Sequence, residues 1–163
     1  MAKNYTYSLY SYSNNIEKIK SCYTTSDFKF DESLYKKGNT FINIRINEDL
    51  MEIIKEIHTD KNKNRKFLIT NEETLLRRLD NNYISCVISL LTKLGYENVK
   101  NNKIEIWKHE GKDFLLEISK YMEDDFFLIR ISSSENNAEE ILNRECCDLE
   151  NVCEFKKPNL NFK

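Results

Sequence analysis

The stretch that decides the fold runs over residues 81–132: NNYISCVISLLTKLGYENVKNNKIEIWKHEGKDFLLEISKYMEDDFFLIRIS. Its start predicts a helix, because apolar residues recur at the spacing of one helix face: Ile84, Val87, Ile88, Leu91 and Leu94. Asn81 or Asn82 can cap this helix, since a short polar side chain accepts an orphan backbone N–H. Gly95 can end it, because glycine adopts the left-handed conformation without a steric penalty.

Three strand-like runs follow this helix, at residues 103–109, 113–121 and 126–133, with short polar breaks between them. A helix that leads into an antiparallel meander must pack its apolar stripe on the sheet or on a partner. A second helix is predicted over residues 136–146, because glutamates enrich its first turn and a narrow apolar edge follows. Residues 149–155 then predict a last strand.

The first half of the chain also predicts strands. Residues 5–12 alternate with period two, and a short helix is expected at Ile16–Cys22. Residues 34–36 and 40–47 flank a Lys-Gly-Asn turn and therefore predict a hairpin. Residues 28–30 are too short to assign.

Leu50–His58 allows two readings. Its apolar residues have helical spacing, whereas the antiparallel neighbours on both sides favour a strand, and we take the strand as the expectation. Residues 66–70 are strand-like, whereas residues 73–79 are mixed and could form a last strand before the helix cap. Neither a repeat nor a linker interrupts the chain, so the sequence predicts one α+β domain over residues 1–163.

Composition excludes several classes of function. Twenty-five basic and 27 acidic residues give a formal charge of −2, which is not the basic footprint of a nucleic-acid-binding domain. The basic run at residues 61–66 is interpreted as a solvated hairpin tip. No apolar run is long enough to cross a bilayer, and the N-terminus has no signal-peptide pattern. The odd cysteine count therefore indicates reduced thiols, and the spacing of Cys146, Cys147 and Cys153 does not match a zinc site.

Charged residues inside apolar strand runs are the main candidates for chemistry: Arg45, Glu105, Glu117 and Arg130. In a closed barrel alternate residues point inward, so such charges could meet and hold a metal ion with a polyphosphate. A site of that kind needs several inward carboxylates and several basic groups. We find at most one carboxylate per strand, so we expect buried ion pairs and neither a metal site nor a cofactor.

Other signatures of catalysis are missing from the sequence. The sequence contains neither G-x-x-x-x-G-K-[ST] nor G-x-G-x-x-G, the two glycine-rich motifs that bind phosphate groups. Only His58 and His109 could serve as a histidine base, and His109 is expected at a solvated hairpin tip.

The order of elements resembles the family of the Mediator head-module subunit eighteen, a component of the RNA polymerase II coactivator. The resemblance is carried by residues 67–73, 91–97, 99–109, 114–120, 127–133, 138–142 and 149–156, with the strand at residues 5–10. It implies an antiparallel, closed or nearly closed β-barrel with a few helices packed on it, related in fold to tunnel triphosphatases. It is also a reason to read Leu50–His58 as a strand.

The resemblance implies a non-catalytic, nuclear interaction subunit that contacts neither nucleic acid nor a membrane directly. The partners implied are a paralogous barrel, Mediator subunit twenty, and a helical segment of Mediator subunit eight. The related tunnel enzymes carry Glu-x-Glu-x-Lys on the first strand, whereas residues 5–10 read YTYSLY. We therefore interpret the barrel as a scaffold rather than an enzyme.

Four aromatic residues are the candidates for the partner interface, because aromatic side chains supply much of the energy of an interface: Trp107, Tyr121, Phe126 and Phe127. The alternative hypothesis is a divergent tunnel-fold phosphohydrolase that acts on triphosphates through the charged residues within the strands. A third hypothesis is an adaptor with an unrelated α+β fold and an open sheet.

Overall fold

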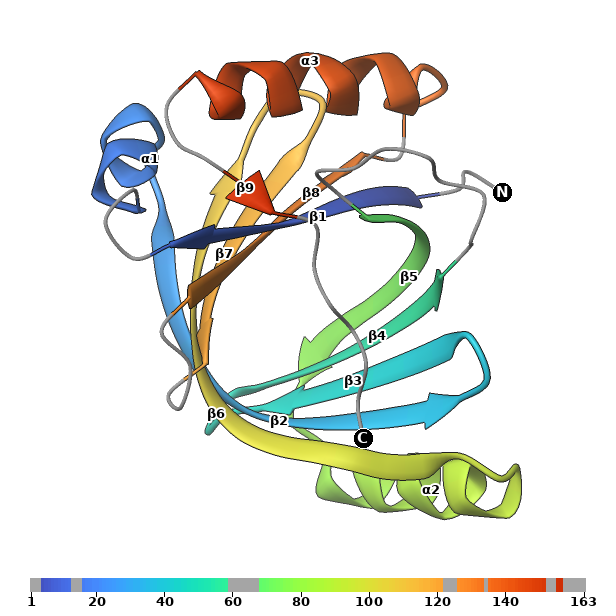
Figure 1. Ribbon diagram of the computed structural model, residues 1–163. Helices are drawn as coiled ribbons and strands as arrows, with labels where there is room; N and C mark the ends of the chain where they lie inside the picture. The colour runs from blue at the N-terminus through green and yellow to red at the C-terminus, as the bar shows by residue number, and fades with distance from the viewer. Residues whose placement is uncertain are drawn as a thin grey trace.

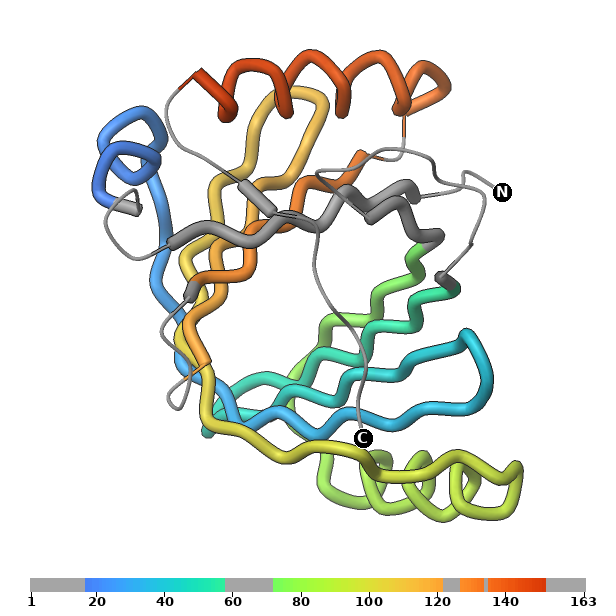
Figure 2. Tube along the Cα trace, in the orientation of Figure 1, coloured from blue at the N-terminus to red at the C-terminus, as the bar shows by residue number. Residues whose placement is uncertain are grey.

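The computed structural model describes the backbone of residues 4–12, 16–58, 68–121, 126–133, 135–151 and 155–156, and the side chains of residues 17–57, 72–121, 127–133 and 135–151. An antiparallel sheet curls into a barrel, whose inner side we call the lumen, and the helices lie on its outside (Figures 1 and 2). In chain order the elements are β1 (Asn4–Tyr12), α1 (Ile16–Cys22), β2 (Ser26–Lys37), β3 (Thr40–Ile46), β4 (Leu50–His58), β5 (Leu68–Arg78), α2 (Asn81–Lys93), β6 (Glu97–Glu110), β7 (Leu115–Tyr121), β8 (Phe126–Ser133), α3 (Ala138–Glu150) and β9 (Phe155–Lys156).

The sheet is a barrel that is open along one side. Its strand order is β5-β4-β3-β2-β6-β7-β8-β1-β9, and β1 also pairs with the first part of β5, from Ser8↔Leu68 to Asn4↔Glu72. Beyond Glu72, β5 continues to Arg78 with β4 as its one partner strand among the described residues. The predicted α+β fold with a curled antiparallel sheet is confirmed. Its expected closure is not, because β5 extends past the end of β1.

Side chains alternate between the two faces of the sheet, and the outer face carries most of the apolar core. On one side, α2 buries Ile84 and Leu91 in a cluster with Ile44 and Met51. On another, α1 and α3 cover the outer face of β7 and β8 in a second cluster, whose members include Ile19, Ile118, Ile129, Ile131, Leu142 and Leu149. The outer face is therefore dry under the helices, which leaves the inner face for other chemistry.

The predicted start of α2 is wrong and its predicted end is confirmed. The N-cap is Asp80, not Asn81 or Asn82: Asp80 has extended backbone angles, and its Oδ1 accepts a hydrogen bond from Tyr83 N at 3.1 Å. The helix therefore starts one or two residues earlier than a cap at Asn81 or Asn82 would give. Gly95 has a φ of 90°, which confirms it as the left-handed residue beyond the helix.

Leu50–His58 is a strand, as expected, because its neighbours β3 and β5 pair with it on both edges. Residues 28–30 belong to the long strand β2, and β6 begins at Glu97 rather than at residue 103. The predicted strand at residues 149–155 is wrong over its first part, since α3 continues to Glu150. Residues 61–66 lie outside the described part of the chain. Within that part, no helix has the length and apolarity needed to cross a membrane.

Candidate functional site

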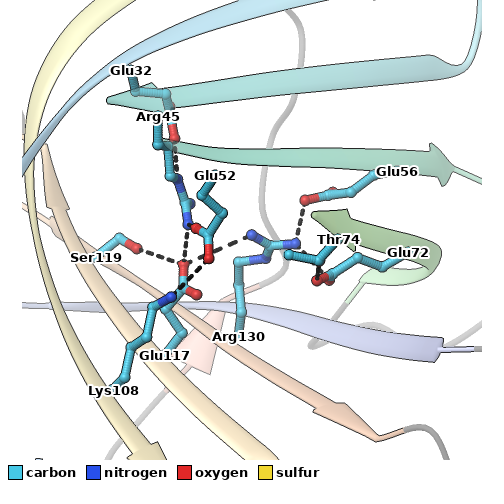
Figure 3. Close-up of polar contacts among 10 residues, drawn as sticks. All are labelled: Glu32, Arg45, Glu52, Glu56, Glu72, Thr74, Lys108, Glu117, Ser119 and Arg130. Atoms are coloured by element: carbon cyan, nitrogen blue, oxygen red, sulfur yellow. Dashed lines mark hydrogen bonds and ion pairs between the residues drawn. The ribbon is translucent and has the colours of Figure 1, made fainter. Parts of the chain in front are cut away.

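The lumen contains a network of buried charges that come from strands β2 to β8 (Figure 3). Its members are Glu32 on β2, Arg45 on β3, Glu52 and Glu56 on β4, Glu72 on β5, Lys108 on β6, Glu117 on β7 and Arg130 on β8. They meet because each occupies an inward position of its strand: Glu32 lies opposite Arg45, Arg45 opposite Glu52, and Glu117 opposite both Lys108 and Arg130. We call this set the lumenal network.

Arg45 is the centre of one half of the network. Its side chain is 1% exposed, and its Nε donates to Glu32 Oε2 at 2.8 Å. Its Nη1 donates to Glu52 Oε1 at 2.9 Å and to Glu117 Oε1 at 2.7 Å. One guanidinium therefore connects three carboxylates from three different strands, a multidentate geometry that the planar, five-donor guanidinium favours.

Arg130 is the centre of the other half. Its Nη2 donates to Glu56 Oε1 and, at 2.8 Å, to Glu72 Oε2. Its Nη1 lies 3.8 Å from Glu117 Oε1, so Glu117 joins the two halves. Thr74 and Ser119 add hydroxyl donors to Glu72 and Glu117.

Lys108 completes the network through an ion pair of 2.8 Å between its Nζ and Glu52 Oε2. Five carboxylates against three cations leave the network with a formal charge of −2. Buried charges are tolerated only when they are paired and hydrogen-bonded, and here the pairing is extensive.

The network shifts the titration of its own members. Burial by itself would raise the pKa of Glu117, but the guanidinium groups of Arg45 and Arg130 lower it to about 2. Burial likewise opposes the charge on Arg45, yet Glu117, Glu32 and Glu52 raise its pKa well above the usual value. Both groups therefore stay ionised at neutral pH.

Two buried donors among the described residues of the lumen have no acceptor. Arg130 Nε makes no hydrogen bond, although the residue is only 5% exposed, and neither does the buried Nδ2 of Asn102. Asn102 lies opposite Glu32 in the β2–β6 register and so occupies an inward position. An unpaired buried donor is unfavourable, and an oxygen acceptor on a ligand would satisfy the one on Arg130.

An apolar layer lies next to the charges inside the lumen. Phe30, Ile104 and Ile106 are buried there, with Phe28, Leu50 and Tyr121 packed against them. Lys108 Nζ lies 5.6 Å from the centre of the Phe28 ring, so this layer borders the lumenal network directly.

The structure brings together three of the four charges that the sequence singled out. Arg45, Glu117 and Arg130 belong to the lumenal network, but Glu105 does not. Ile104 and Ile106 take the inward positions on β6, so Glu105 is on the outer face beside Lys29. There, burial and the carboxyl of Asp27 raise its pKa.

The sequence pattern did not single out the remaining members: Glu32, Glu52, Glu56, Glu72 and Lys108. The expectation of at most one carboxylate per strand is wrong for β4, which contributes both Glu52 and Glu56. The signal was present, because the strand reading of Leu50–His58 places these two glutamates on one face with Ile54. The helical spacing of the isoleucines in the same segment made this shared face of Glu52 and Glu56 hard to recognise.

The aromatic interface candidates are spread over both faces of the sheet. Phe127 is buried in the cluster under α3, and half-buried Trp107 packs on that cluster with Lys20 Nζ 4.1 Å from its ring centre. Tyr121 is in the apolar layer of the lumen. The side chain of Phe126 lies outside the described residues. Partner binding through these residues stays a prediction.

The glutamates of the lumenal network are chemically suited to bind a divalent metal ion, but they are not placed to do so. Glutamate oxygens suit a hard divalent cation such as Mg²⁺ or Mn²⁺. Among the described residues, however, no three His, Cys, Asp or Glu side chains are placed so that they could hold one. The carboxylates face guanidinium and ammonium groups instead, so this arrangement contains no preformed metal site.

No protein-family model and no curated protein sequence matches this chain. Solved structures do share its fold. The PH1819 protein of Pyrococcus horikoshii is 13% identical, with 96% of each chain covered and a TM-score of 0.66. HpAC1 of Hippeastrum, named as a candidate adenylyl cyclase with a dominant triphosphatase activity, is 6% identical, with 98% of this chain and 92% of that chain covered and a TM-score of 0.60.

A candidate adenylate cyclase of Bacillus halodurans is 9% identical, with 98% of this chain and 97% of that chain covered and a TM-score of 0.56. At such identities the likeness shows the fold and nothing finer. The barrel that the Mediator resemblance implied is therefore shown in its coarse form. The Mediator family itself stays a prediction.

Proposed function

We propose that this chain binds a triphosphate, together with a divalent cation, in its lumen and hydrolyses the terminal phosphoanhydride bond. This is the alternative of the sequence analysis rather than its main hypothesis. The observation that carries it is the lumenal network, in which three cations and five carboxylates converge inside a curled barrel. The likeness in fold to HpAC1, which is named for a triphosphatase activity, supports the same direction.

The charges of the network match a cation–triphosphate complex. The phosphate oxygens would take over Arg45, Arg130 and Lys108, since guanidinium and ammonium groups bind phosphate strongly. The glutamates released by this exchange would face the cation that arrives with the triphosphate. The unpaired Arg130 Nε is a further donor ready for an oxygen acceptor. The eight described members of the network have a formal charge of −2, which disfavours a bare polyanion, so we take the complex as the substrate.

The reaction that follows is a hydrolysis in which water adds to the terminal phosphorus and the bridging P–O bond breaks. The products are inorganic phosphate and a diphosphate. The protein's contribution is to position the phosphate chain and to stabilise the charge that develops on its oxygens, which is the main catalytic demand in phosphoryl transfer.

The test is release of phosphate from tripolyphosphate and from ATP in the presence of Mg²⁺ or Mn²⁺. We expect activity in the wild type, a loss of about 100-fold or more in Glu117→Gln, and little change in Glu105→Gln, whose side chain lies outside the barrel. A matched thermal unfolding curve shows that each variant is folded. Activity that Glu105→Gln removes and Glu117→Gln keeps would contradict the assignment of the lumen.

A non-catalytic scaffold is the second candidate, because each carboxylate of the lumenal network already has a cationic partner. In that case the network stabilises the barrel and the outer surface binds a partner, as a Mediator-type subunit would. A folded wild type that neither binds nor hydrolyses the metal–triphosphate complex would favour this candidate over the first.

A further inference from the structure

The far part of β5, residues 73–78, is an exposed strand edge. It pairs with β4 on one side, and no strand of the described chain pairs with its other side, since the β1 pairing stops at Glu72. The side chain of Leu76 in this segment is 52% exposed, and Glu73, Arg77 and Arg78 are exposed as well. An open edge with free backbone N–H and C=O groups is a template for another strand.

The sequence of this edge is complementary to itself in the antiparallel direction. Residues 72–78 read EETLLRR, with acidic residues before Leu75 and basic residues after it at matching distances. If two copies pair about Leu75, Glu73 of each copy lies opposite Arg77 of the other, and Thr74 lies opposite Leu76. The numbers of two residues that face each other in this register differ by an even number. Because side chains alternate along a strand, the two residues then lie on the same face of their own sheets, so each face of one sheet continues into the same face of the other.

We propose that two copies of this chain associate through residues 73–77 of β5, antiparallel and centred on Leu75, so that the two sheets become continuous. The two-fold axis makes the contact isologous and closed, which limits the assembly to a dimer. Charge complementarity selects a second copy of the chain as the occupant of the edge. This association does not depend on the proposed activity.

The contact is small and therefore weak. It comprises five residue pairs, two of them Glu–Arg pairs near solvent, where ion pairs add little affinity but select the register. We expect a dimer that forms in the micromolar to millimolar range and dissociates on dilution.

Sedimentation of the full chain from about 10 µM to about 1 mM tests the association. We expect a shift from monomer to dimer with concentration. Glu73→Arg and Arg77→Glu should each raise the dissociation constant at least about tenfold, because each places like charges opposite one another. An equimolar mixture of the two variants should restore dimers, because every pair across the mixed interface again joins opposite charges.

Further variants distinguish pairing along β5 from association through a different surface. The double variant Glu73→Arg/Arg77→Glu should dimerise like the wild type, since it reverses both members of each pair. The matched charge reversals Glu140→Arg and Lys112→Glu, on exposed positions away from β5, should leave the dimer unchanged. A wild type that stays monomeric at about 1 mM, or a dimer that the swaps at positions 73 and 77 leave intact, would overturn the proposal.

Discussion

Arg45 shows how a charged lumen can be compatible with a stable fold. Its guanidinium is withdrawn from water, and Glu32, Glu52 and Glu117 each accept one of its hydrogen bonds. The desolvation of such groups is costly, and the cost is offset only while all partners are present. The network therefore behaves as a unit, in which the loss of one carboxylate weakens the pairing of a buried guanidinium that several strands share.

Glu117 predicts a specific dependence of stability on pH. Its pKa in the folded state is about 2, against an ordinary value of 4.5. A lowered pKa contributes stability that is fully present above about pH 4.5 and is lost as the pH falls toward 2. The difference in unfolding free energy between wild type and Glu117→Gln should therefore shrink by roughly 3 kcal/mol between pH 7 and pH 2.

Urea unfolding at a series of pH values measures this difference. Glu140→Gln, an exposed substitution on α3, is the control, and its difference from the wild type should stay small throughout. A constant gap between the wild type and Glu117→Gln across the series would mean that Glu117 is not held ionised by the arginines.

At the scale of elements, β4 explains how one strand serves two environments. Met51 lies in the apolar cluster under α2, whereas Glu52 and Glu56 point into the lumen. The period of two along a strand separates these side chains. Helices α2 and α3 then cover the outer face, and their buried residues mark which side of each helix is needed for stability.

Leucines on α3 and α2 give a matched test of that packing. Leu142 is 0% exposed in the middle of α3, whereas Leu90 is 56% exposed on α2. Leu142→Ala should lower the unfolding free energy by about 2–5 kcal/mol, because it leaves a cavity under the helix. Leu90→Ala should change it by less than about 0.5 kcal/mol. Chemical denaturation measures both, and equal effects would place α3 differently on the sheet.

At the scale of the whole molecule, the barrel brings together charges that are far apart in sequence, from Glu32 to Arg130. A ligand that binds this folded arrangement and not the unfolded chain must stabilise it. With Mg²⁺ and tripolyphosphate together near 100 times their dissociation constant, the gain is about 2.7 kcal/mol, or roughly 5–10 °C in Tm.

Differential scanning calorimetry checks this stabilisation. Mg²⁺ alone and tripolyphosphate alone should each shift Tm less than the mixture, since the lumen binds the complex. Glu117→Gln should lose the shift and Glu105→Gln should keep it. If the mixture and the separate components give the same Tm as buffer, the lumen does not bind the complex.

Local pattern sufficed for most of the elements. The apolar period and Gly95 located α2, the alternation at residues 5–12 located β1, and the antiparallel context identified β4. These features depend on residues within a few positions of each other, so they can be predicted from the sequence. The extension of α3 beyond residue 146 was not predicted, although Leu142, Cys146 and Leu149 continue one helical stripe.

The lumenal network could not be predicted from local sequence pattern. Arg45, Glu117 and Arg130 could be named as candidates, but a charge within a strand does not reveal its face until the register of its neighbours is known. That register put Glu105 outside and brought Glu32, Glu52, Glu56, Glu72 and Lys108 inside. Sequence alone indicated most of the strands. Tertiary structure alone decided which charges meet, because strand pairing and the curl of the sheet are long-range properties.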